Sequence, residues 1–323
     1  MCKKIDVAGA CALLREWDDV LILTHQRPDG DALGSAFALM WALEALGKRA
    51  GIDCADPIPE RYRLIMGEYR PKQFSPRFVV SVDTAGPNLL GHLKASWENR
   101  IDLCIDHHRI NTISAAYCFV DPEAPATAQL IYEVVAQLGV SFCPSIAGAI
   151  YTGLVTDTGC FRYPNVTART HRIAAEMIEA GAPHGEINRI MFDTRSRAMV
   201  ELDKILLETL EYHFGGLCAL MLVSRKVTER LKIEESDLDG ISAVPRRIQG
   251  VEVGLILRET PDGYRVSVRT REHVDASALC AVFDGGGHRS AGGCTIVGGE
   301  QEVRGALLPA VEQALRDVGL SWR

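Results

Sequence analysis

Short apolar runs recur through the first half of the chain, and each one stops at a histidine or an aspartate. Three of these runs cover residues 20–24, 78–82 and 101–105. Apolar runs of this length, bounded by turn-forming residues, are typical of strands buried in a parallel sheet. Helical spacing of apolar residues is found over 32–46, 127–138, 144–157 and 170–180. Strands that alternate with helices predict an α/β fold with a doubly wound, mainly parallel sheet.

The rest of the chain has a different pattern and predicts a second, smaller mixed α/β domain. Strands are expected over 217–223, 251–259 and 264–270, with a hairpin turn signal at Pro261-Asp262-Gly263. A short helix over 276–283, a glycine-rich loop, a strand over 294–297 and a last helix over 300–318 follow. We therefore predict a catalytic domain over 1–192, a helical linker over 193–214 and a second domain over 215–323. The active-site cleft is expected between the two domains.

Acids and histidines follow the apolar runs of the first domain in a regular order. They are His25, Asp29, Asp31, Asp83, Asp106, His107, His108 and Asp157. An aspartate after a strand is common as a helix cap or turn former, so any one of them has a purely structural explanation. In open α/β sheets, however, sites form beyond the carboxyl ends of the strands. The ordered set therefore predicts oxygen and imidazole ligands that converge on one crevice.

The charge of this crevice indicates metal ions. Asp29, Asp31, Asp83 and Asp157 would carry four like charges, and packed carboxylates cannot all stay ionised without compensation. Two divalent cations supply that compensation, and two ions roughly 3.5–4 Å apart can clamp a phosphoryl centre. Mixed carboxylate and imidazole donors suit Mn²⁺, with Mg²⁺ as the alternative. The sequence thus predicts a two-metal site.

The glycine-rich segment of the second domain is a candidate anion site. A lone glycine triplet is usually a flexible link, but here His288 and Arg289 follow it at once. Successive backbone amides beside cationic side chains can bind an anion, and an arginine on the preceding strand can fork onto a phosphate. We expect contacts to a phosphate or nucleotide from Arg269, Gly286, Gly287 and His288.

Composition limits the class of partner and the compartment. The chain has 323 residues and a net charge of −7, which argues against binding long nucleic acid, since that usually needs a basic surface. Its ten cysteines include no C-x-x-C pair, and no secretory signature precedes them, so we expect reduced thiols in the cytoplasm. No apolar run approaches the roughly 18 residues of a membrane span.

The motifs, in their order, resemble those of the DHH phosphoesterase family. Residues 25–35 resemble its first motif, Asp83 its second, and Asp106-His107-His108 the motif that names it. Residues 153–159 resemble the fourth motif, and residues 283–293 resemble the glycine-rich signature of the companion DHHA1 domain. The resemblance covers nearly the whole chain. It is strongest to the small stand-alone nano-RNases, bifunctional oligoribonucleases that also act on 3′-phosphoadenosine 5′-phosphate.

This resemblance implies roles for individual residues. One ion would be held by His25, Asp29 and Asp83, and the other by Asp31, Asp83, His107 and Asp157. In catalysis, Asp106 would orient a histidine and His108 would touch the substrate phosphate or the leaving oxygen. The second domain would hold the terminal nucleotide through Arg269, Gly286, Gly287 and His288.

The expected activity is hydrolysis of very short oligoribonucleotides to mononucleotides. Dephosphorylation of 3′-phosphoadenosine 5′-phosphate, or cleavage of linear or cyclic dinucleotides, would use the same site. The alternatives are an enzyme like the manganese pyrophosphatases, a RecJ-like exonuclease, or a non-catalytic nucleotide-binding regulator. Short single-stranded RNA and small nucleotides are the expected partners, without long nucleic acid or a membrane. The sequence leaves the oligomeric state open, a homodimer included.

Overall fold

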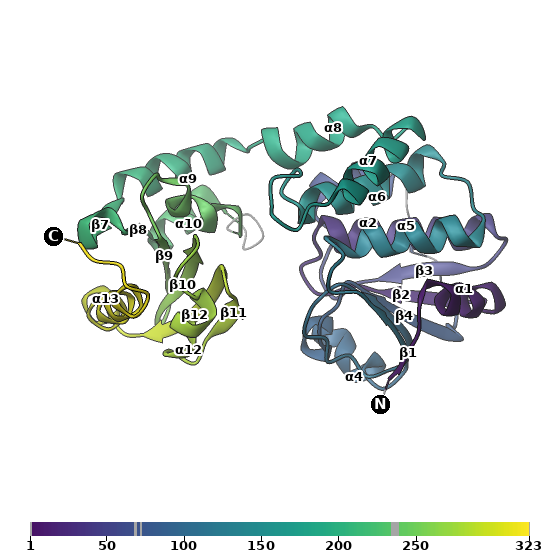
Figure 1. The fold of residues 1–323 in the computed structure, drawn as a ribbon, viewed down its shortest axis with the longest axis horizontal. Coiled ribbons are helices and arrows are strands. Elements are labelled where there is room, and N and C mark those ends of the chain that lie inside the picture. Colours follow the sequence, from purple (N-terminus) through teal and green to yellow (C-terminus); the bar gives the residue numbers. More distant parts are fainter. Residues whose placement is uncertain (1, 68–69, 72, 234–238, 323) are drawn as a thin grey trace. The chain divides into compact units, whose positions relative to one another are not determined.

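A computed structural model describes residues 2–67, 70–71, 73–233 and 239–322. It forms two compact units, Met1–Thr194 (unit 1) and Arg195–Arg323 (unit 2), which are described separately below (Figure 1).

Unit 1 is built on a six-stranded sheet in which every neighbouring pair of strands is parallel. The strand order is β1 (Lys3–Lys4), β6 (Ala115–Val120), β5 (Ile101–Asp106), β4 (Phe78–Val82), β2 (Val20–Leu23) and β3 (Ala50–Asp53). The parallel sheet and its strands β2, β4 and β5 confirm the prediction. The strands β1, β3 and β6 were not anticipated.

Helices cover both faces of this sheet. One face carries α1 (Val7–Glu16), α2 (Gly30–Ala45), α5 (Thr127–Leu138), α6 (Pro144–Asp157) and α7 (Ala168–Glu179). Of these, α2, α5, α6 and α7 lie together in Figure 1. The other carries η2 (Pro87–Leu93) and α4 (Lys94–Trp97). Side chains alternate between the two faces, so Val80 packs into the first core and Val79 into the second. The doubly wound arrangement follows from this alternation.

The helix boundaries predicted from the sequence were accurate where a glycine cap marks the end of a helix or a proline marks its start. Helix α5 ends at Gly139, which adopts a left-handed φ of 78°, and α6 begins at Pro144, as predicted. Helix α2 starts two residues earlier than expected because Asp29 caps it. The remaining helical segments are η1 (Glu60–Tyr62), α3 (Arg63–Met66), α8 (His184–Asn188) and η3 (Arg189–Asp193).

Unit 2 contains a mixed six-stranded sheet. Its order is β11 (Gly286–His288), β12 (Ala291–Val297), β10 (Gly263–Thr270), β9 (Val253–Thr260), β8 (Cys218–Val223) and β7 (Glu211–His213), with β8 and β9 the parallel pair. The core beneath one face includes α12 (Ala276–Ala281) and α13 (Glu300–Asp317). A second core packs α9 (Arg197–Glu208) against β8 and β9. Shorter helical segments are η4 (Phe214–Gly216), α10 (Arg225–Leu231), η5 (Asp239–Ala243) and η6 (Pro245–Arg247).

Two expectations for the second half of the chain were wrong. Residues 195–214 do not form one helix, because β7 follows α9 and pairs with β8. The glycine-rich segment is not a loop either, since β11 and β12 form an antiparallel hairpin at the edge of the sheet. Glycines have low strand propensity, so β11 forms because the neighbouring strand β12 supplies a pairing partner and not because of local preference.

One pair of cysteines departs from the expected reduced state. Cys2 and Cys118 are joined by a disulfide, with their Cα atoms 6.0 Å apart. The short strand β1 pairs with β6 and brings the start of the chain next to Cys118, which the sequence gave no reason to expect. The other cysteines are free thiols.

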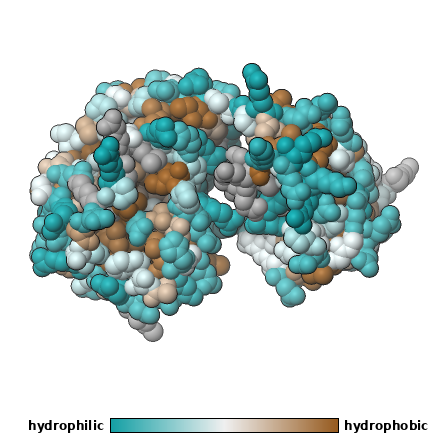
Figure 2. Space-filling view, turned by 180° about the vertical axis from the view of Figure 1, so that it is seen from behind, coloured by the Kyte–Doolittle hydropathy of each residue, from teal (hydrophilic) through white to brown (hydrophobic). Residues whose placement is uncertain are grey.

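Hydrophobic residues form small separate groups on the surface drawn in Figure 2. No helix in the described ranges is long and apolar enough to cross a bilayer.

Candidate metal centre

The acids and histidines singled out in the sequence lie at the carboxyl ends of the central strands of the unit 1 sheet. Some follow the carboxyl ends of the neighbouring strands β2, β4 and β5, and others lie in the first turn of α2 and at the last residue of α6. The set comprises His25, Asp29, Asp31, Asp83, Asp106, His107, His108 and Asp157.

One group of donor atoms surrounds the ring of His25. Its Nε2 atom lies 3.7 Å from Oδ1 of Asp29 and 3.8 Å from Oδ2 of Asp83. Asp29 is fixed because its Oδ1 also accepts hydrogen bonds from the backbone N–H groups of Asp31 and Ala32, each at 3.0 Å. The cap that starts α2 therefore also aims a carboxylate at His25.

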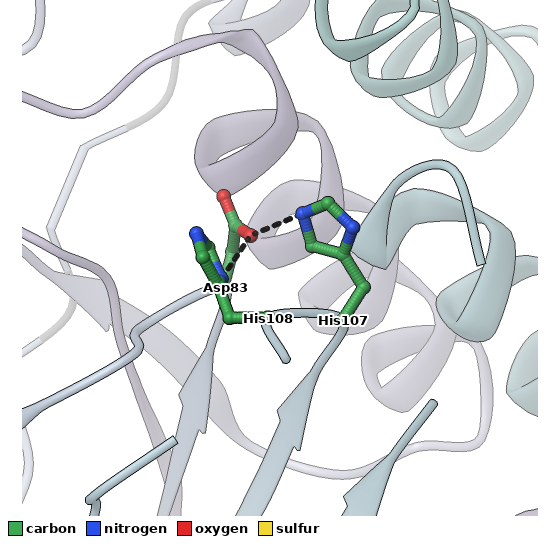
Figure 3. A group of neighbouring side chains, drawn as sticks. All are labelled: Asp83, His107 and His108. Carbon is green, nitrogen blue, oxygen red and sulfur yellow. Dashed lines mark ion pairs between the residues drawn. The ribbon is translucent and has the colours of Figure 1, made fainter. Parts of the chain in front are cut away.

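A second group surrounds His107. Its Nε2 atom lies 3.3 Å from Oδ2 of Asp157, 3.7 Å from Oδ1 of Asp83 and 3.9 Å from Oδ2 of Asp31. Figure 3 shows the ring of His107 directed at Asp83. Asp83 belongs to both groups, since its Oδ2 lies near His25 and its Oδ1 near His107. It is the carboxylate placed to be shared.

Backbone carbonyls fix the orientation of both histidine rings. Nδ1 of His25 lies 2.8 Å from the carbonyl oxygen of Gln26, and Nδ1 of His107 lies 3.1 Å from that of Ala124. Because a carbonyl oxygen can only accept, Nδ1 carries the proton in each neutral ring and Nε2 keeps its lone pair. Histidines oriented in this way are typical of metal ligands.

The N-terminus of α5 holds the buried carboxylate of Asp31. Oδ2 of Asp31 accepts a hydrogen bond from the N–H of Thr127 at 2.6 Å, and Oδ1 accepts one from the N–H of Ala128 at 2.8 Å. The Thr127 hydroxyl donates to Oδ1 of Asp83 at 2.9 Å. Free amides and the helix dipole favour negative charge at this end of a helix. The start of α5 thus orients two carboxylates of the centre.

Glycines allow α2 and α6 to approach closely at the centre. A Cβ on Gly153 would lie 2.5 Å from Cβ of Ala128 and 2.8 Å from Oδ1 of Asp31. A Cβ on Gly34 would lie 2.4 Å from the carbonyl oxygen of Ala149. Side chains do not make contacts this short, so these positions need glycine to keep the last turn of α6 beside α2.

Asp106 contacts a different histidine from those in the two donor groups. Its Oδ1 lies 2.7 Å from Nδ1 of His108, and its Oδ2 accepts a hydrogen bond from Nδ2 of Asn111 at 2.5 Å. His108 also lies beside Asp83, with its Nδ1 atom 3.8 Å from Oδ1 (Figure 3). Since Asp106 occupies Nδ1 of His108, the Nε2 atom remains for a further partner.

Burial and mutual repulsion raise the pKa values of three carboxyl groups at the centre. Burial, together with the charge of Asp83, raises the pKa of Asp31 to about 8. Burial also raises the pKa of Asp83 and that of Asp157 to about 7, with further contributions from neighbouring carboxylates. Burial lowers the pKa of His25, but the hydrogen bond and charge of Asp29 outweigh it and raise the value to about 9.

These properties fit divalent metal ions. Three sets of side chains in the described residues each bring imidazole and carboxylate ligand atoms within 4.8 Å of one another: His25, Asp29 and Asp83; Asp31, His107 and Asp157; and Asp83, His107 and His108. Carboxyl groups with such raised pKa values need nearby positive charge to stay ionised at neutral pH. Oxygen and imidazole donors together suit manganese or magnesium rather than a thiolate-bound metal.

Two of the four candidate phosphate-binding residues of unit 2, Arg269 and His288, share one row of registered residues across its sheet. Arg269 on β10 is the register partner of Ala291 on β12, and Ala291 is in turn the partner of His288 on β11. Registered residues point to the same face, so Arg269 and His288 lie on one face, roughly 10 Å apart across two strand spacings. Gly286 and Gly287 lie exposed on the same edge strand as His288.

Two residues with clear contacts at the centre were missed in the sequence. Thr127 looked like the first residue of an ordinary helix, and only the fold brings it to Asp31 and Asp83. Asn111 follows Asp106 closely in the chain, and a polar residue so near a buried acid was a signal that could have been used.

Comparison with known proteins identifies a domain in each unit. Residues 19–154 match the DHH family, N-terminal domain, and residues 221–317 match the DHHA1 domain. The chain is 34% identical over 307 residues to the bifunctional oligoribonuclease and PAP phosphatase NrnA of Thermus thermophilus, covering 93% of this chain and 91% of that protein. It is 25% identical to the protein of the same name from Bacillus subtilis, covering 87% and 90%.

Solved structures share the fold over nearly the whole chain. An exopolyphosphatase-related protein from Bacteroides fragilis superposes with a TM-score of 0.86 at 22% identity, covering 96% of both chains. A manganese-bound RecJ from Thermus thermophilus superposes with a TM-score of 0.59 at 15% identity, covering 96% of this chain and 55% of that one.

Proposed function

Because the chain belongs to the DHH family of phosphoester hydrolases, we propose that it is a metal-dependent phosphodiesterase that degrades short oligoribonucleotides to mononucleotides. We propose that it also removes a phosphate from 3′-phosphoadenosine 5′-phosphate. The observation that carries the proposal is the pair of donor groups that share Asp83. The relatives from Thermus thermophilus and Bacillus subtilis, both named for these two activities, support it.

Six residues would hold two divalent ions, with Mn²⁺ favoured and Mg²⁺ as the alternative. His25, Asp29 and Asp83 would hold one. Asp31, Asp83, His107 and Asp157 would hold the other. When bound, the ions supply positive charge at the phosphate and an activated water. The contacts of Thr127 and Ala124 keep the carboxylates and the His107 ring in position for this role.

His108 would serve as the proton donor of the reaction. The hydrogen bond that Nδ1–H of His108 donates to Asp106 outweighs the effect of burial and raises the pKa of His108 to about 9, so the ring is protonated at neutral pH. A protonated ring whose Nδ1 is held by Asp106 can donate from Nε2 to a phosphate oxygen or to the leaving oxygen. Asp106 itself would position His108 without touching the substrate.

Unit 2 would hold the terminal nucleotide through Arg269, Gly286, Gly287 and His288. Arg269 and His288 lie on one face of the sheet, at the spacing of two strands. A guanidinium and an imidazole at such a spacing can grip a phosphate and its nucleoside. Selection of short chains would follow if the two domains close on the substrate, with the bond to be cut lying at the metal centre. Linear or cyclic dinucleotides would fit the same arrangement.

The competing functions fit the observations less well. A relic site in a nucleotide-binding regulator would have no need for a full set of converging carboxylates and oriented histidines. A RecJ-like exonuclease for long strands is disfavoured by the net charge of −7. An enzyme like the manganese pyrophosphatases would have no use for the glycine-histidine strand of unit 2.

A manganese-dependent hydrolysis panel tests the proposal. The substrates are RNA chains from dinucleotide to decanucleotide, 3′-phosphoadenosine 5′-phosphate, cyclic di-AMP and pyrophosphate, with Asp83→Ala protein as the background control. We expect the shortest RNA and 3′-phosphoadenosine 5′-phosphate to be hydrolysed fastest. Fast hydrolysis of pyrophosphate alone would favour the hypothesis that the protein is a pyrophosphatase. Binding of nucleotides without turnover of any substrate would favour the regulator.

A further inference from the structure

Three consecutive residues in left-handed backbone conformation follow the metal-centre residue Asp157. Gly159, Cys160 and Phe161 have φ values of 56°, 60° and 60°. Residues other than glycine rarely adopt this conformation, and strained backbone of this kind is concentrated at functional sites. The conformation therefore needs support from the surrounding structure.

Hydrogen bonds tie this turn to the end of α6. The N–H of Cys160 donates to the carbonyl of Val155 at 2.7 Å, and the N–H of Phe161 donates to the Thr158 hydroxyl at 3.1 Å. The N–H groups of Arg162 and Tyr163 both donate to the carbonyl of Thr158, at 3.0 and 3.1 Å. The turn is thus fixed to the helix end that carries Asp157.

Tyr163 lies with one face of its ring on this turn. A Cβ on Gly159 would be 2.3 Å from Cζ of the tyrosine and 2.6 and 2.7 Å from Cε1 and Cε2. Ring carbons rather than the hydroxyl are the nearest atoms, so Gly159 lies against the face of the ring. Tyr163 is 47% exposed. Within the described part of the chain, its ring and hydroxyl have no aromatic or hydrogen-bonding partner.

The segment that follows Tyr163 contacts the loop before α5, which also orients His107. Nδ2 of Asn165 donates to the carbonyl of Pro125 at 3.1 Å. The neighbouring residue Ala124 holds the ring of His107. Tyr163 therefore lies between two anchors, one at Asp157 and one at the segment that orients His107. Both anchors belong to unit 1.

From this geometry we infer that Tyr163 is a stacking platform for a nucleobase of the substrate, next to the bond that is cut. This inference rests on the proposed function. A ring backed on one face by a glycine and exposed elsewhere presents a flat apolar surface, and bases of any sequence stack on such surfaces. The ring is 47% exposed and lies six residues after Asp157 in the chain, which leaves surface available for a base in this part of unit 1.

The test compares Tyr163→Leu and Tyr163→Phe with the wild-type protein on two substrates. One is the RNA dinucleotide pApA, and the other is the same compound with both adenines replaced by hydrogen, which leaves the ribose phosphates intact. Tyr212→Leu is the matched control, since Tyr212 is 54% exposed and belongs to β7 of unit 2, whereas Tyr163 belongs to unit 1. Bound metal is measured in every variant.

Tyr163→Leu should lower kcat/KM for pApA by roughly 5- to 100-fold, mainly through KM, and leave the value for the base-free compound unchanged. Tyr163→Phe and Tyr212→Leu should behave like the wild type, with full metal content. Equal losses on both substrates, no loss on either, or loss of metal in Tyr163→Leu would overturn the inference. If the wild-type protein cleaves neither compound, the proposed function itself has failed, which is a different result.

Discussion

The Nδ1 atom of His108 lies 2.7 Å from Oδ1 of Asp106, a carboxylate that is completely buried. The second oxygen of Asp106 is held by Asn111, so the carboxylate cannot turn away. His107, the preceding residue, instead has its Nδ1 atom against the carbonyl of Ala124. Two adjacent histidines are thus oriented by different partners, and we propose different tasks for them on this basis.

His108→Ala should keep both metal ions and lose most turnover. The ring contributes a proton rather than a ligand in the proposed mechanism, and removal of a general acid typically costs about 10²- to 10⁴-fold in rate. His107→Ala should lose metal from the second donor group. Metal content and kcat, measured on both variants, check the division. Equal loss of metal in the two variants would contradict it.

Asp106→Asn should move the alkaline limit of activity to lower pH. In the wild type, Asp106 raises the pKa of His108 to about 9, so the protonated, active ring is lost only as pH rises through that value. Without the carboxylate, the largest influence that raises the pKa of His108 is lost while burial still lowers it, so the proton is lost at a lower pH. The pH profile of kcat at saturating manganese is the measurement, and an unchanged alkaline limb would argue against His108 as the acid.

Asp83→Ala should lose both ions, and Asp157→Ala only one. Asp83 has one oxygen near His25 and the other near His107, whereas Asp157 lies near His107 alone. Both variants should lack turnover because the reaction needs the pair of ions. Metal analysis after gel filtration distinguishes them. Two ions retained by Asp83→Ala would show that the carboxylate is not shared.

Gly153→Ala should damage the centre without touching a ligand. The new methyl group would lie 2.5 Å from Cβ of Ala128 and 2.8 Å from Oδ1 of Asp31, so α6 must move away from α2 and α5. Overpacking of this kind costs about 1–3 kcal/mol of unfolding free energy. Manganese affinity should fall as well. Gly185→Ala is the control, because no atom lies within 4 Å of its Cβ position. Its unfolding free energy should be at least as high as that of the wild type, since alanine favours a helix more than glycine does.

Much of the centre could be predicted because its residues follow buried strands. The runs before His25, Asp83 and Asp106 are strands β2, β4 and β5 at the middle of the parallel sheet, where local pattern and fold agree. The end of α5 at Gly139 and the start of α6 at Pro144 were likewise marked by the conformational limits of those residues.

What could not be predicted depends on contacts between distant parts of the chain. Thr127 reaches Asp31 and Asp83 only because α5 packs beside α2. The strand at Gly286–His288 exists because β12 supplies a partner, since three residues rich in glycine do not indicate a strand by themselves. The Cys2–Cys118 disulfide depends on the pairing of β1, which has only two residues and no pattern to detect.

The double variant Arg269→Ala/His288→Ala should lose cleavage of dinucleotides and keep weak hydrolysis of a small activated phosphodiester. Both residues lie on one face of the unit 2 sheet, in the row of Ala291, while every proposed metal ligand lies in unit 1. Their contribution would be positioning, which can be large because proximity governs rate.

The same variant should also lose the preference for dinucleotide over decanucleotide RNA, since the grip on the terminal nucleotide would select for length. Arg265→Ala is the matched control. Arg265 lies on β10 like Arg269 but outside the row of Ala291 and His288, as its partner on β12 is Thr295. Kinetics on the three substrates, with metal content unchanged, measure the effect. Unchanged dinucleotide cleavage by the double variant would mean that length selection arises in unit 1, where the exposed ring of Tyr163 would be the next residue to test.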